Sequence, residues 1–367
     1  MKVLIITNTL YERCGSGRYS LGVVENLQRA EVEVVLLCEQ KPGGITIEWH
    51  RLLPPSSPIS FLRNILMTRR LAGSVDVVHA LDGWPFGVYG YTGVLGTSKK
   101  FFINGVGTYS VAPLHSLWLG WLVRRAYQAT GRIFCISAYV KNQLLKAGVS
   151  SDKPTVVHLG SDKLPVLSQE EEEKYRNEFS VDRLRFPVIL TVGDIKNRKG
   201  QFDTLQAVWR LKEKYPQILY IVAGTCNLEY IKDMHTYATL HDLTGNFRVV
   251  SSIDDTTLAF LYSICTLVAL NSNNNEIRHH FEGFGLVIIE GYQFGKPAVG
   301  SRNCGIEDAI ENGKTGLLAN QGDQLDIAEK IEKVLENLSF FSHNARMRYT
   351  TFDWRNTVSA YIAAYKK

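Results

Sequence analysis

Residues 279–301 read HHFEGFGLVIIEGYQFGKPAVGS and hold the densest group of functional signals in the chain. A glycine-rich turn at 283–285 precedes an amphipathic run that begins at Leu286 and has helical spacing. Glycine lets a ligand approach the backbone closely, and the first N–H groups of a helix have no partner within the helix. We therefore predict an anion-binding site at the N–H groups of Gly285, Leu286 and Val287.

Two glutamates, Glu282 and Glu290, flank this turn eight positions apart. Glu290 falls just over one turn into the predicted helix, since an α-helix has about 3.6 residues per turn. A carboxylate there can accept hydrogen bonds from the vicinal hydroxyls of a ribose, while Glu282 would face a second polyhydroxylated group beyond the phosphates. This spacing predicts a nucleotide-sugar site. The alternative is that Glu282 is a helix-start charge and Glu290 a surface residue.

A second loop lies in TVGDIKNRKGQFDTLQAV at residues 191–208, after a predicted strand that ends at Val192. Gly193 begins the loop, and Arg198 and Lys199 precede the next helix. Ligands of open α/β sheets gather at the carboxyl ends of the strands, so these cations are expected to face the same ligand. Two fixed cations can neutralise a diphosphate leaving group as its charge grows. The alternative is a solvated surface pair.

Short apolar runs alternate with amphipathic runs along the chain. Strands are predicted at residues 2–7, 31–38, 75–80, 100–105, 131–137, 154–159, 187–193, 218–224, 247–252, 266–271 and 296–301. Helices are predicted at 20–29, 140–147, 201–214, 256–263, 286–294 and 325–338. Runs that are apolar on both faces are typical of parallel sheets covered by helices, so we predict a doubly wound α/β architecture.

One stretch, residues 161–186, interrupts this alternation and is charged and proline-containing. Its acidic run at 170–173 is interpreted as a solvated helix face. The strand pattern restarts at 187. A chain of 367 residues exceeds the usual size of one domain, so we predict two Rossmann-like halves joined by this linker.

The net charge of +5 conceals an asymmetry between these halves. Residues 1–165 hold 18 Lys and Arg against 10 Asp and Glu, a charge of +8, whereas the remainder holds 23 against 26, a charge of −3. The total is too small to indicate a nucleic-acid-binding protein, and a 45% hydrophobic content excludes a disordered one. The basic half is expected to meet an anionic acceptor or a membrane surface.

The six cysteines show neither C-x-x-C nor metal-ligand spacing, so we expect no disulfide and a cytoplasmic location. They are Cys14, Cys38, Cys135, Cys226, Cys265 and Cys304. The start, MKVLIITNTL, is too short for a membrane span and has no cleavage site, so it is predicted to be a strand. We expect a soluble protein or one peripheral to the cytoplasmic face of a membrane.

Taken in order, these motifs resemble the retaining nucleotide-sugar glycosyltransferases of family 4, also called group 1, which have the GT-B fold. The resemblance is dense between Val188 and Ala319, where VGDIKNRKG, IVAGTCNLEY, LYSICTLVALN, EGFGLVIIEGYQFGKPAVGS and ENGKTGLLAN match. It implies two Rossmann-like domains that face a central cleft, with a C-terminal helix crossing back. The acceptor domain is expected at 1–162 plus 352–367, and the nucleotide-sugar domain at 163–351.

The resemblance also implies roles for residues of the second half. Arg198 and Lys199 would bind the donor diphosphate, helped by Gly193 and the N–H groups of 285–287. Glu290 would bind the ribose and Glu282 the donor sugar ring, so Glu282, Arg198 and Lys199 form the expected catalytic set. The implied donor is a UDP-sugar, or next a GDP-mannose, and the hexose would go to a glycan or lipid-linked acceptor. No cofactor is expected, and no metal, because the chain has no D-x-D.

The first half matches the family less closely. Gly15 and Gly17 in TNTLYERCGSGRYS resemble its glycine-rich donor loop, for which a plain surface turn is the alternative. In FFINGVGTYS, Asn104 stands where the family usually has His, and because Asn does not titrate we expect it to bind a sugar hydroxyl rather than transfer a proton. Tyr109 and Asp82 are further candidates for the acceptor pocket.

Two arginine-containing amphipathic segments account for much of the basic charge. In residues 60–74, SFLRNILMTRRLAGS, we favour an apolar face turned to the core with solvated arginines. In residues 114–132, LHSLWLGWLVRRAYQATGR, we favour contact with a membrane or lipid acceptor.

Transfer is expected to proceed on one face of the sugar within an ion pair, because no convincing second carboxylate faces the reacting carbon. The alternatives are a nucleotide-sugar epimerase of the same fold and a non-catalytic nucleotide-sugar-binding protein. An NAD dehydrogenase is disfavoured, since no G-x-G-x-x-G follows the first strand.

Overall fold

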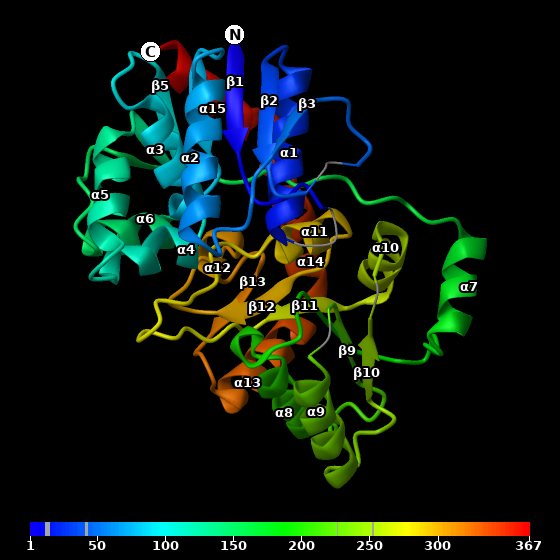
Figure 1. Cartoon of the computed structure of the whole chain (residues 1–367). Helices are drawn as coiled ribbons and strands as arrows, with labels where there is room; N and C mark the ends of the chain where they lie inside the picture. The colour runs from blue at the N-terminus through cyan, green and yellow to red at the C-terminus, as the bar shows by residue number, and fades with distance from the viewer. Residues whose placement is uncertain (12–14, 41–42, 226, 252) are drawn as a thin grey trace. The chain divides into compact units, whose positions relative to one another are not determined.

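The computed structural model describes residues 1–11, 15–40, 43–225, 227–251 and 253–367. The chain forms two compact units (Figure 1). The first comprises Met1–Gly160, Glu276–Gly283 and Asp353–Lys367, and the second comprises Ser161–Asn275 and Phe284–Phe352. The predicted division placed residues 276–283 in the second domain, whereas their contacts in the structure are with the first unit.

The first unit is built on a seven-stranded parallel sheet in the order β3-β2-β1-β4-β5-β6-β7. Its strands are β1 (Lys2–Ile6), β2 (Glu33–Cys38), β3 (Glu48–Arg51), β4 (Val77–Ala80), β5 (Lys100–Gly105), β6 (Arg132–Cys135) and β7 (Pro154–Val156). Only β3 was not predicted. It lies at the sheet edge with half-buried and exposed residues, so it lacks the apolar run of a central strand.

Helices connect these strands as a doubly wound sheet requires, which confirms the predicted architecture. They are α1 (Gly15–Arg29), α2 (Pro58–Ala72), α3 (Val88–Val94), α4 (Thr108–Val111), α5 (Gly120–Ala129), α6 (Ala138–Lys146) and α15 (Trp354–Lys366), with the short turns η1 (Gly83–Gly87) and η2 (Ala112–His115). The last of them, drawn in red in Figure 1, packs against α1 in the first unit. The expectation that the C-terminal helix crosses back to the N-terminal domain is therefore confirmed.

A buried polar network joins α15 to the sheet. His79 Nε2 lies 2.7 Å from Asn104 Oδ1, and Asn104 Nδ2 donates to the hydroxyl of Tyr361 at 2.9 Å and to that of Tyr19. The other ring nitrogen of His79 bonds the hydroxyl of Tyr365. Burial lowers the pKa of His79 to about 4, so the ring is neutral and donates from Nε2 to the amide oxygen while Nδ1 accepts from Tyr365.

The second unit has a six-stranded parallel sheet in the order β10-β9-β8-β11-β12-β13. Its strands are β8 (Val188–Val192), β9 (Leu219–Ala223), β10 (Phe247–Val250), β11 (Leu267–Leu270), β12 (Ala298–Ser301) and β13 (Gly316–Ala319). The edge strand β13 was not predicted, and Ser252, at the end of the run predicted for β10, lies outside the described residues.

The helices of the second unit include every one that the sequence predicted there. They are α7 (Gln169–Glu178), α8 (Gln201–Leu211), α9 (Leu228–Leu240), α10 (Asp255–Ile264), α11 (Leu286–Gln293), α12 (Ile306–Ala309), α13 (Gln324–Glu336) and α14 (Leu338–Tyr349), with the short turn η3 (Asn197–Lys199). Helix α7 has no buried residue, as expected for the acidic run. A shared core of strand residues such as Val222 and helix residues such as Leu205 fixes the sheet against α8, α9 and α13.

We expect Asn104→Leu to lower the free energy of unfolding by about 3 kcal/mol, because His79, Tyr19 and Tyr361 each lose a buried hydrogen-bond partner. Asn142→Leu on the exposed side of α6 is the matched control and should change stability by less than about 0.5 kcal/mol. Thermal and urea unfolding of both variants measures the difference. Equal stabilities would contradict a structural role for the network.

Candidate functional site

The strongest candidate site lies at the carboxyl edge of the second sheet, where β8 and β11 are neighbours. The loop from Gly193 to Gly200 follows β8, and the helix that begins at Leu286 follows β11 along the chain. Parallel strands direct their carboxyl ends to one edge, which is where α/β proteins bind ligands. The structure thus brings the two motifs predicted to bind the donor to one edge of one sheet.

The loop after β8 is held against the end of β11 by backbone contacts. Gly200 has φ +65°, and a Cβ at this position would lie 1.8 Å from the carbonyl oxygen of Asn271. The N–H of Asn273 donates to the carbonyl of Arg198 at 2.7 Å. Only glycine fits at Gly200, so this contact fixes the position of the η3 turn that carries Arg198 and Lys199.

Lys199 lies over Gly193, the residue that begins the loop. A Cβ on Gly193 would come within 3.9 Å of Lys199 Nζ, and its φ of +132° also favours glycine. Gly224, at the end of β9, approaches the same backbone, because its Cβ would lie 1.9 Å from the carbonyl oxygen of Gly193. Gly224 was not among the predicted site residues, although its place as the last residue of a predicted strand is the signal that points to it.

The start of α11 has the geometry of an anion site. Gly285 is the N-cap residue with φ +96°, and no side chain caps the helix. Leu286 and Val287 begin the helix and are half-buried, and their N–H groups have no carbonyl one turn earlier in the helix. A backbone start of this kind presents N–H groups and the positive end of the helix dipole to an anion.

Glu290 is buried in α11, so the alternative that it is a surface residue is wrong. Tyr262 on α10 donates from its hydroxyl to Glu290 Oε2 at 2.9 Å, and the same hydroxyl lies 2.9 Å from the carbonyl oxygen of Val287. Tyr262 therefore fixes the orientation of the carboxylate. Tyr262 was not predicted to be a site residue. Its one distinguishing feature in the sequence is a polar hydroxyl within the apolar run before β11.

Glu282 belongs to the segment Glu276–Gly283, which packs on the first unit. A Cβ on Gly283 would lie 2.1 Å from the carbonyl oxygen of Val106, just after β5. The ring of His279 stacks on that of His115 with centroids 3.7 Å apart. The segment thus places the half-buried Glu282 beside the loop that follows β5.

Asp82 and Ser110 meet at the carboxyl edge of the first sheet. Asp82 follows β4 and accepts hydrogen bonds from the N–H of Gly83 at 2.7 Å and the hydroxyl of Ser110 at 2.5 Å. Burial raises the pKa of Asp82 to about 7, against the opposing effect of these two donors. Tyr109, next to Ser110, is 65% exposed. The suggestion that Asp82 and Tyr109 line the acceptor pocket stays a prediction.

Asn104 requires a correction. Its side chain is fully buried, and its amide bonds three other side chains of the first unit. A sugar hydroxyl does not reach an amide enclosed in this way, so we revise its role from acceptor contact to a structural one. The family resemblance identified a position in the chain, but not the side of the sheet that its side chain faces.

At the start of α1, one of the two predicted glycines is closely packed and the other is not. Gly17 is buried, and a Cβ there would lie 2.0 Å from the carbonyl oxygen of Tyr11. Gly15 begins the helix in open surroundings. Residues 12–14 of this motif lie outside the described residues, so the predicted donor contact of Gly15 and Gly17 stays a prediction.

The potential metal ligands and the cysteines in the part of the chain that the structure describes form neither a metal-binding cluster nor a disulfide. No group of three or more His, Cys, Asp or Glu residues is arranged there to hold a metal ion. Cys38, Cys135, Cys265 and Cys304 are buried without a disulfide in that part, while Cys14 and Cys226 lie outside it. The expectation of metal independence stays a prediction.

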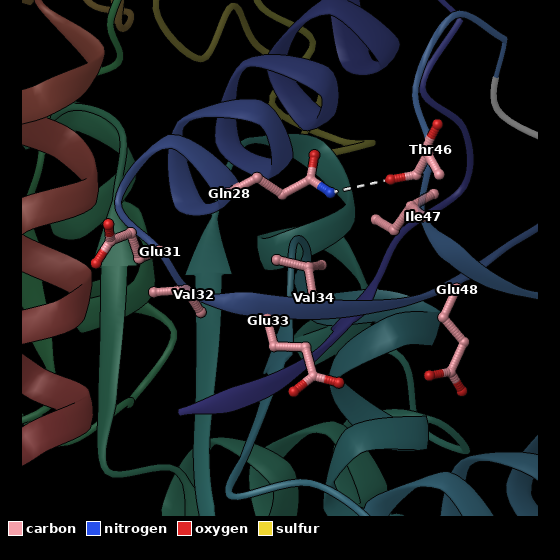
Figure 2. A pocket seen from close by; sticks show the side chains of 8 residues that line it. All are labelled: Gln28, Glu31, Val32, Glu33, Val34, Thr46, Ile47 and Glu48. Carbon is pink, nitrogen blue, oxygen red and sulfur yellow. Dashed lines mark hydrogen bonds between the residues drawn. The ribbon is translucent and has the colours of Figure 1, made fainter.

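A hollow of 460 Å³ lies at the edge of the first sheet where its strands begin, opposite the carboxyl ends of the strands (Figure 2). Glu33 and Glu48 are the first residues of β2 and β3, so the hollow is at the amino ends of the strands. Lys2 forms ion pairs with both at 2.7 Å and 3.2 Å, and Glu31 adds a third carboxylate to the lining. This acidic surface does not suit a diphosphate, so we assign no donor site to it.

Two doubly wound sheets, one with a glycine-capped helix start and two cations at its carboxyl edge, define an α/β protein of the nucleotide-binding class. Comparison with known proteins is more specific. The model for glycosyl transferases group 1 matches residues 173–354, and that for glycosyltransferase family 4 matches residues 14–163. Together they span most of the chain, and the protein belongs to the group 1 glycosyltransferases of family 4.

Curated relatives match about half of the chain. Glycogen synthase from Mycobacterium tuberculosis is 29% identical over 182 residues, 48% of this chain and 42% of that protein. The capsular polysaccharide biosynthesis glycosyltransferase CapM from Staphylococcus aureus is 28% identical over 228 residues, 59% of this chain and 56% of CapM. The chain therefore aligns with about half the length of these relatives.

Solved structures match over the whole chain. The glycosyltransferase from Rickettsia africae has a TM-score of 0.84 at 18% identity, covering 100% of this chain and 97% of that one. Anabaena Alr3699/HepE, crystallised with UDP and glucose, has a TM-score of 0.82 at 18% identity and full coverage of both chains. These likenesses confirm the predicted GT-B fold.

We expect Gly200→Ala to destabilise the protein at least twice as much as Gly313→Ala. Both glycines have positive φ, but Gly313 has nothing within 4 Å of a Cβ, whereas Gly200 faces Asn271 at 1.8 Å. Gly313→Ala therefore measures backbone strain alone, about 1 kcal/mol. Thermal unfolding compares the two, and equal losses would show that the Gly200 contact does not constrain the loop.

The raised pKa of Asp82 predicts a specific pH dependence. The folded protein binds this proton more tightly than the unfolded chain, so stability from this group falls as pH rises from about 4 to about 7. The free energy of unfolding of Asp82→Asn, relative to that of the wild type, should therefore rise by about 1–3 kcal/mol between pH 4 and pH 7. Above pH 7 this difference should not grow further.

Asp152→Asn is the matched control for this measurement. A hydrogen bond from Ser150 lowers the pKa of Asp152. The difference in free energy of unfolding between Asp152→Asn and the wild type should therefore stay constant between pH 4 and pH 7. Urea unfolding at a series of pH values measures both variants. A constant difference for Asp82→Asn as well would contradict the assignment.

Proposed function

We propose that this protein transfers a hexose from a nucleoside diphosphate, with a UDP-sugar as the favoured donor, to a hydroxyl of a glycan or lipid-linked acceptor. The observation that carries the proposal is the edge of the second sheet, where the glycine-capped start of α11, the buried Glu290 and the cation of Lys199 occur together. Support comes from Anabaena Alr3699/HepE, which was solved with UDP-glucose, and from relatives named for glycogen and capsule synthesis.

The donor diphosphate would bind the first N–H groups of α11 together with Arg198 and Lys199. Backbone N–H groups supply fixed partial charges, while the two side chains supply full charges on a turn held by Gly200. Glu290, oriented by Tyr262, would accept hydrogen bonds from the ribose hydroxyls. Glu282 would contact the donor sugar ring, as the family resemblance implies.

In the proposed reaction the bond between the anomeric carbon and the diphosphate oxygen breaks, and a bond from that carbon to the acceptor oxygen forms. The acceptor proton passes to the departing diphosphate oxygen, so charge and atoms balance without a protein base. Arg198 and Lys199 stabilise the charge that develops on the diphosphate. The new bond forms on the face that the diphosphate leaves, which gives retention of configuration.

Substitutions at Glu290 and Lys199 should have separable effects. Glu290→Gln removes the charge that binds the ribose and should weaken UDP binding about tenfold or more. Lys199→Ala should reduce kcat about 100-fold, because its charge acts most on the transition state. Calorimetry with UDP and the rate of UDP release from UDP-glucose, with water or added glycan as acceptor, measure the two effects.

Lys196→Ala is the control for both measurements, because Lys196 lies in the same loop but pairs with Asp194 at 2.8 Å. It should leave UDP affinity and kcat within about twofold of the wild type. If Glu290→Gln and Lys199→Ala behave like Lys196→Ala, the donor site is not where we place it.

A further inference from the structure

Helix α2 of the first unit turns several polar residues inward and exposes several apolar ones. Its buried residues include Ser60, Asn64 and Thr68, whereas Ile59, Leu62 and Leu66 are 81%, 57% and 59% exposed. We call these three apolar residues the α2 stripe. The expectation that Leu62 and Leu66 face the core is therefore wrong, although Leu71 and Ala72 at the end of α2 are buried.

The orientation of α2 is fixed by satisfied hydrogen bonds. Asn64 accepts from the N–H of Leu53 at 3.0 Å and donates to its carbonyl at 2.7 Å and to the hydroxyl of Tyr89 at 3.1 Å. Ser57 and Ser60 form a capping box at the helix start. A rotation that buried the α2 stripe would break these bonds, so its exposure belongs to the native fold.

Three arginines accompany the stripe on the outer side of the helix. At about 100° per residue, Ile59, Leu62 and Leu66 fall within a sector of about 60°, and exposed Arg63, Arg69 and Arg70 extend that sector to about 120°. The sequence of α2 contains no Asp or Glu. The outer face of α2 is thus apolar along its centre and cationic at its margins.

A second exposed apolar group lies at the start of α5. Leu117, Trp118 and Trp121 are 95%, 90% and 65% exposed, and the guanidinium of Arg125 lies 5.9 Å from the ring centre of Trp121. Helix α3 contacts both α2 and α5. Residues 49–151, which include both groups, hold eleven Lys and Arg against two Asp and Glu, a charge of +9.

We propose that the α2 stripe and the start of α5 dock on the surface of an anionic phospholipid bilayer. Leucine and isoleucine side chains enter the boundary between headgroups and acyl chains, and arginines at the margin meet the lipid phosphates. Tryptophan prefers the same boundary because its ring is apolar and its N–H is polar. Binding of this surface to a bilayer does not depend on the proposed sugar transfer.

Two other occupants fit less well. A second copy of this chain in a two-fold dimer would bring each outer face against its own equivalent, and arginines would meet arginines with no carboxylate on α2 or α5 to pair with them. Insertion across the bilayer is not indicated either, since none of the helices in the described ranges is long and apolar enough to span a membrane.

The test is flotation of the full chain with vesicles of phosphatidylcholine alone and of phosphatidylcholine mixed with phosphatidylglycerol. We expect the mixed vesicles to bind the protein and the neutral ones to bind it at least tenfold more weakly. Leu62→Ser combined with Leu66→Ser should reduce binding to mixed vesicles about tenfold or more, because both lose apolar contact. Arg69→Gln combined with Arg70→Gln should reduce it by a similar factor.

The matched control is Leu228→Ser combined with Leu240→Ser, since these leucines of α9 are 82% and 77% exposed in the second unit. It should bind vesicles as the wild type does, and all variants should retain UDP affinity. Equal binding by the α2 leucine variant and the wild type would overturn the proposal. So would equal binding to neutral and mixed vesicles, or a wild-type dimer in light scattering that the leucine substitutions convert to a monomer.

Discussion

The proposed donor-binding edge of the second unit depends on one backbone contact, between Gly200 and the carbonyl of Asn271. The end of β11 occupies the space that any side chain at residue 200 would need. This contact ties the turn of Arg198 and Lys199 to the strand that leads toward α11, so the two cations and the helix start have a common support. The backbone that carries the flexible lysine and arginine side chains is thereby held in one position. Charges held in this way can stabilise a transition state, in addition to attracting a ligand.

Much of this edge follows from the sequence, because its signals are local. Apolar runs predicted every strand except the edge strands β3, whose residues are half-buried or exposed, and β13, whose four residues begin with a glycine. The glycines at 193, 200 and 285 lie beside predicted strand ends and helix starts, and each has positive φ in the structure. Glu290 is also local, since its helix position follows from the distance to Gly285.

Other features rest on contacts between distant residues, and no local pattern shows them. Asn64 lies on the inward side of α2 because it bonds Leu53 and Tyr89, so helical periodicity indicated an amphipathic segment but not which of its residues face the core. Asn104 lies inside the first unit, where Tyr361 of α15, 257 positions later in the chain, bonds it. The same holds for Glu282, whose eight-residue spacing from Glu290 does not reveal that its segment packs beside Val106.

The first unit is assembled from three separate pieces of chain, and the last is α15. During synthesis on a ribosome, the second unit is complete once Phe352 has emerged, whereas the first still lacks its final helix. The half that is made first is therefore finished last. Until α15 arrives, His79 lacks Tyr365, Asn104 lacks Tyr361, and the sheet face beneath this helix stays open to water.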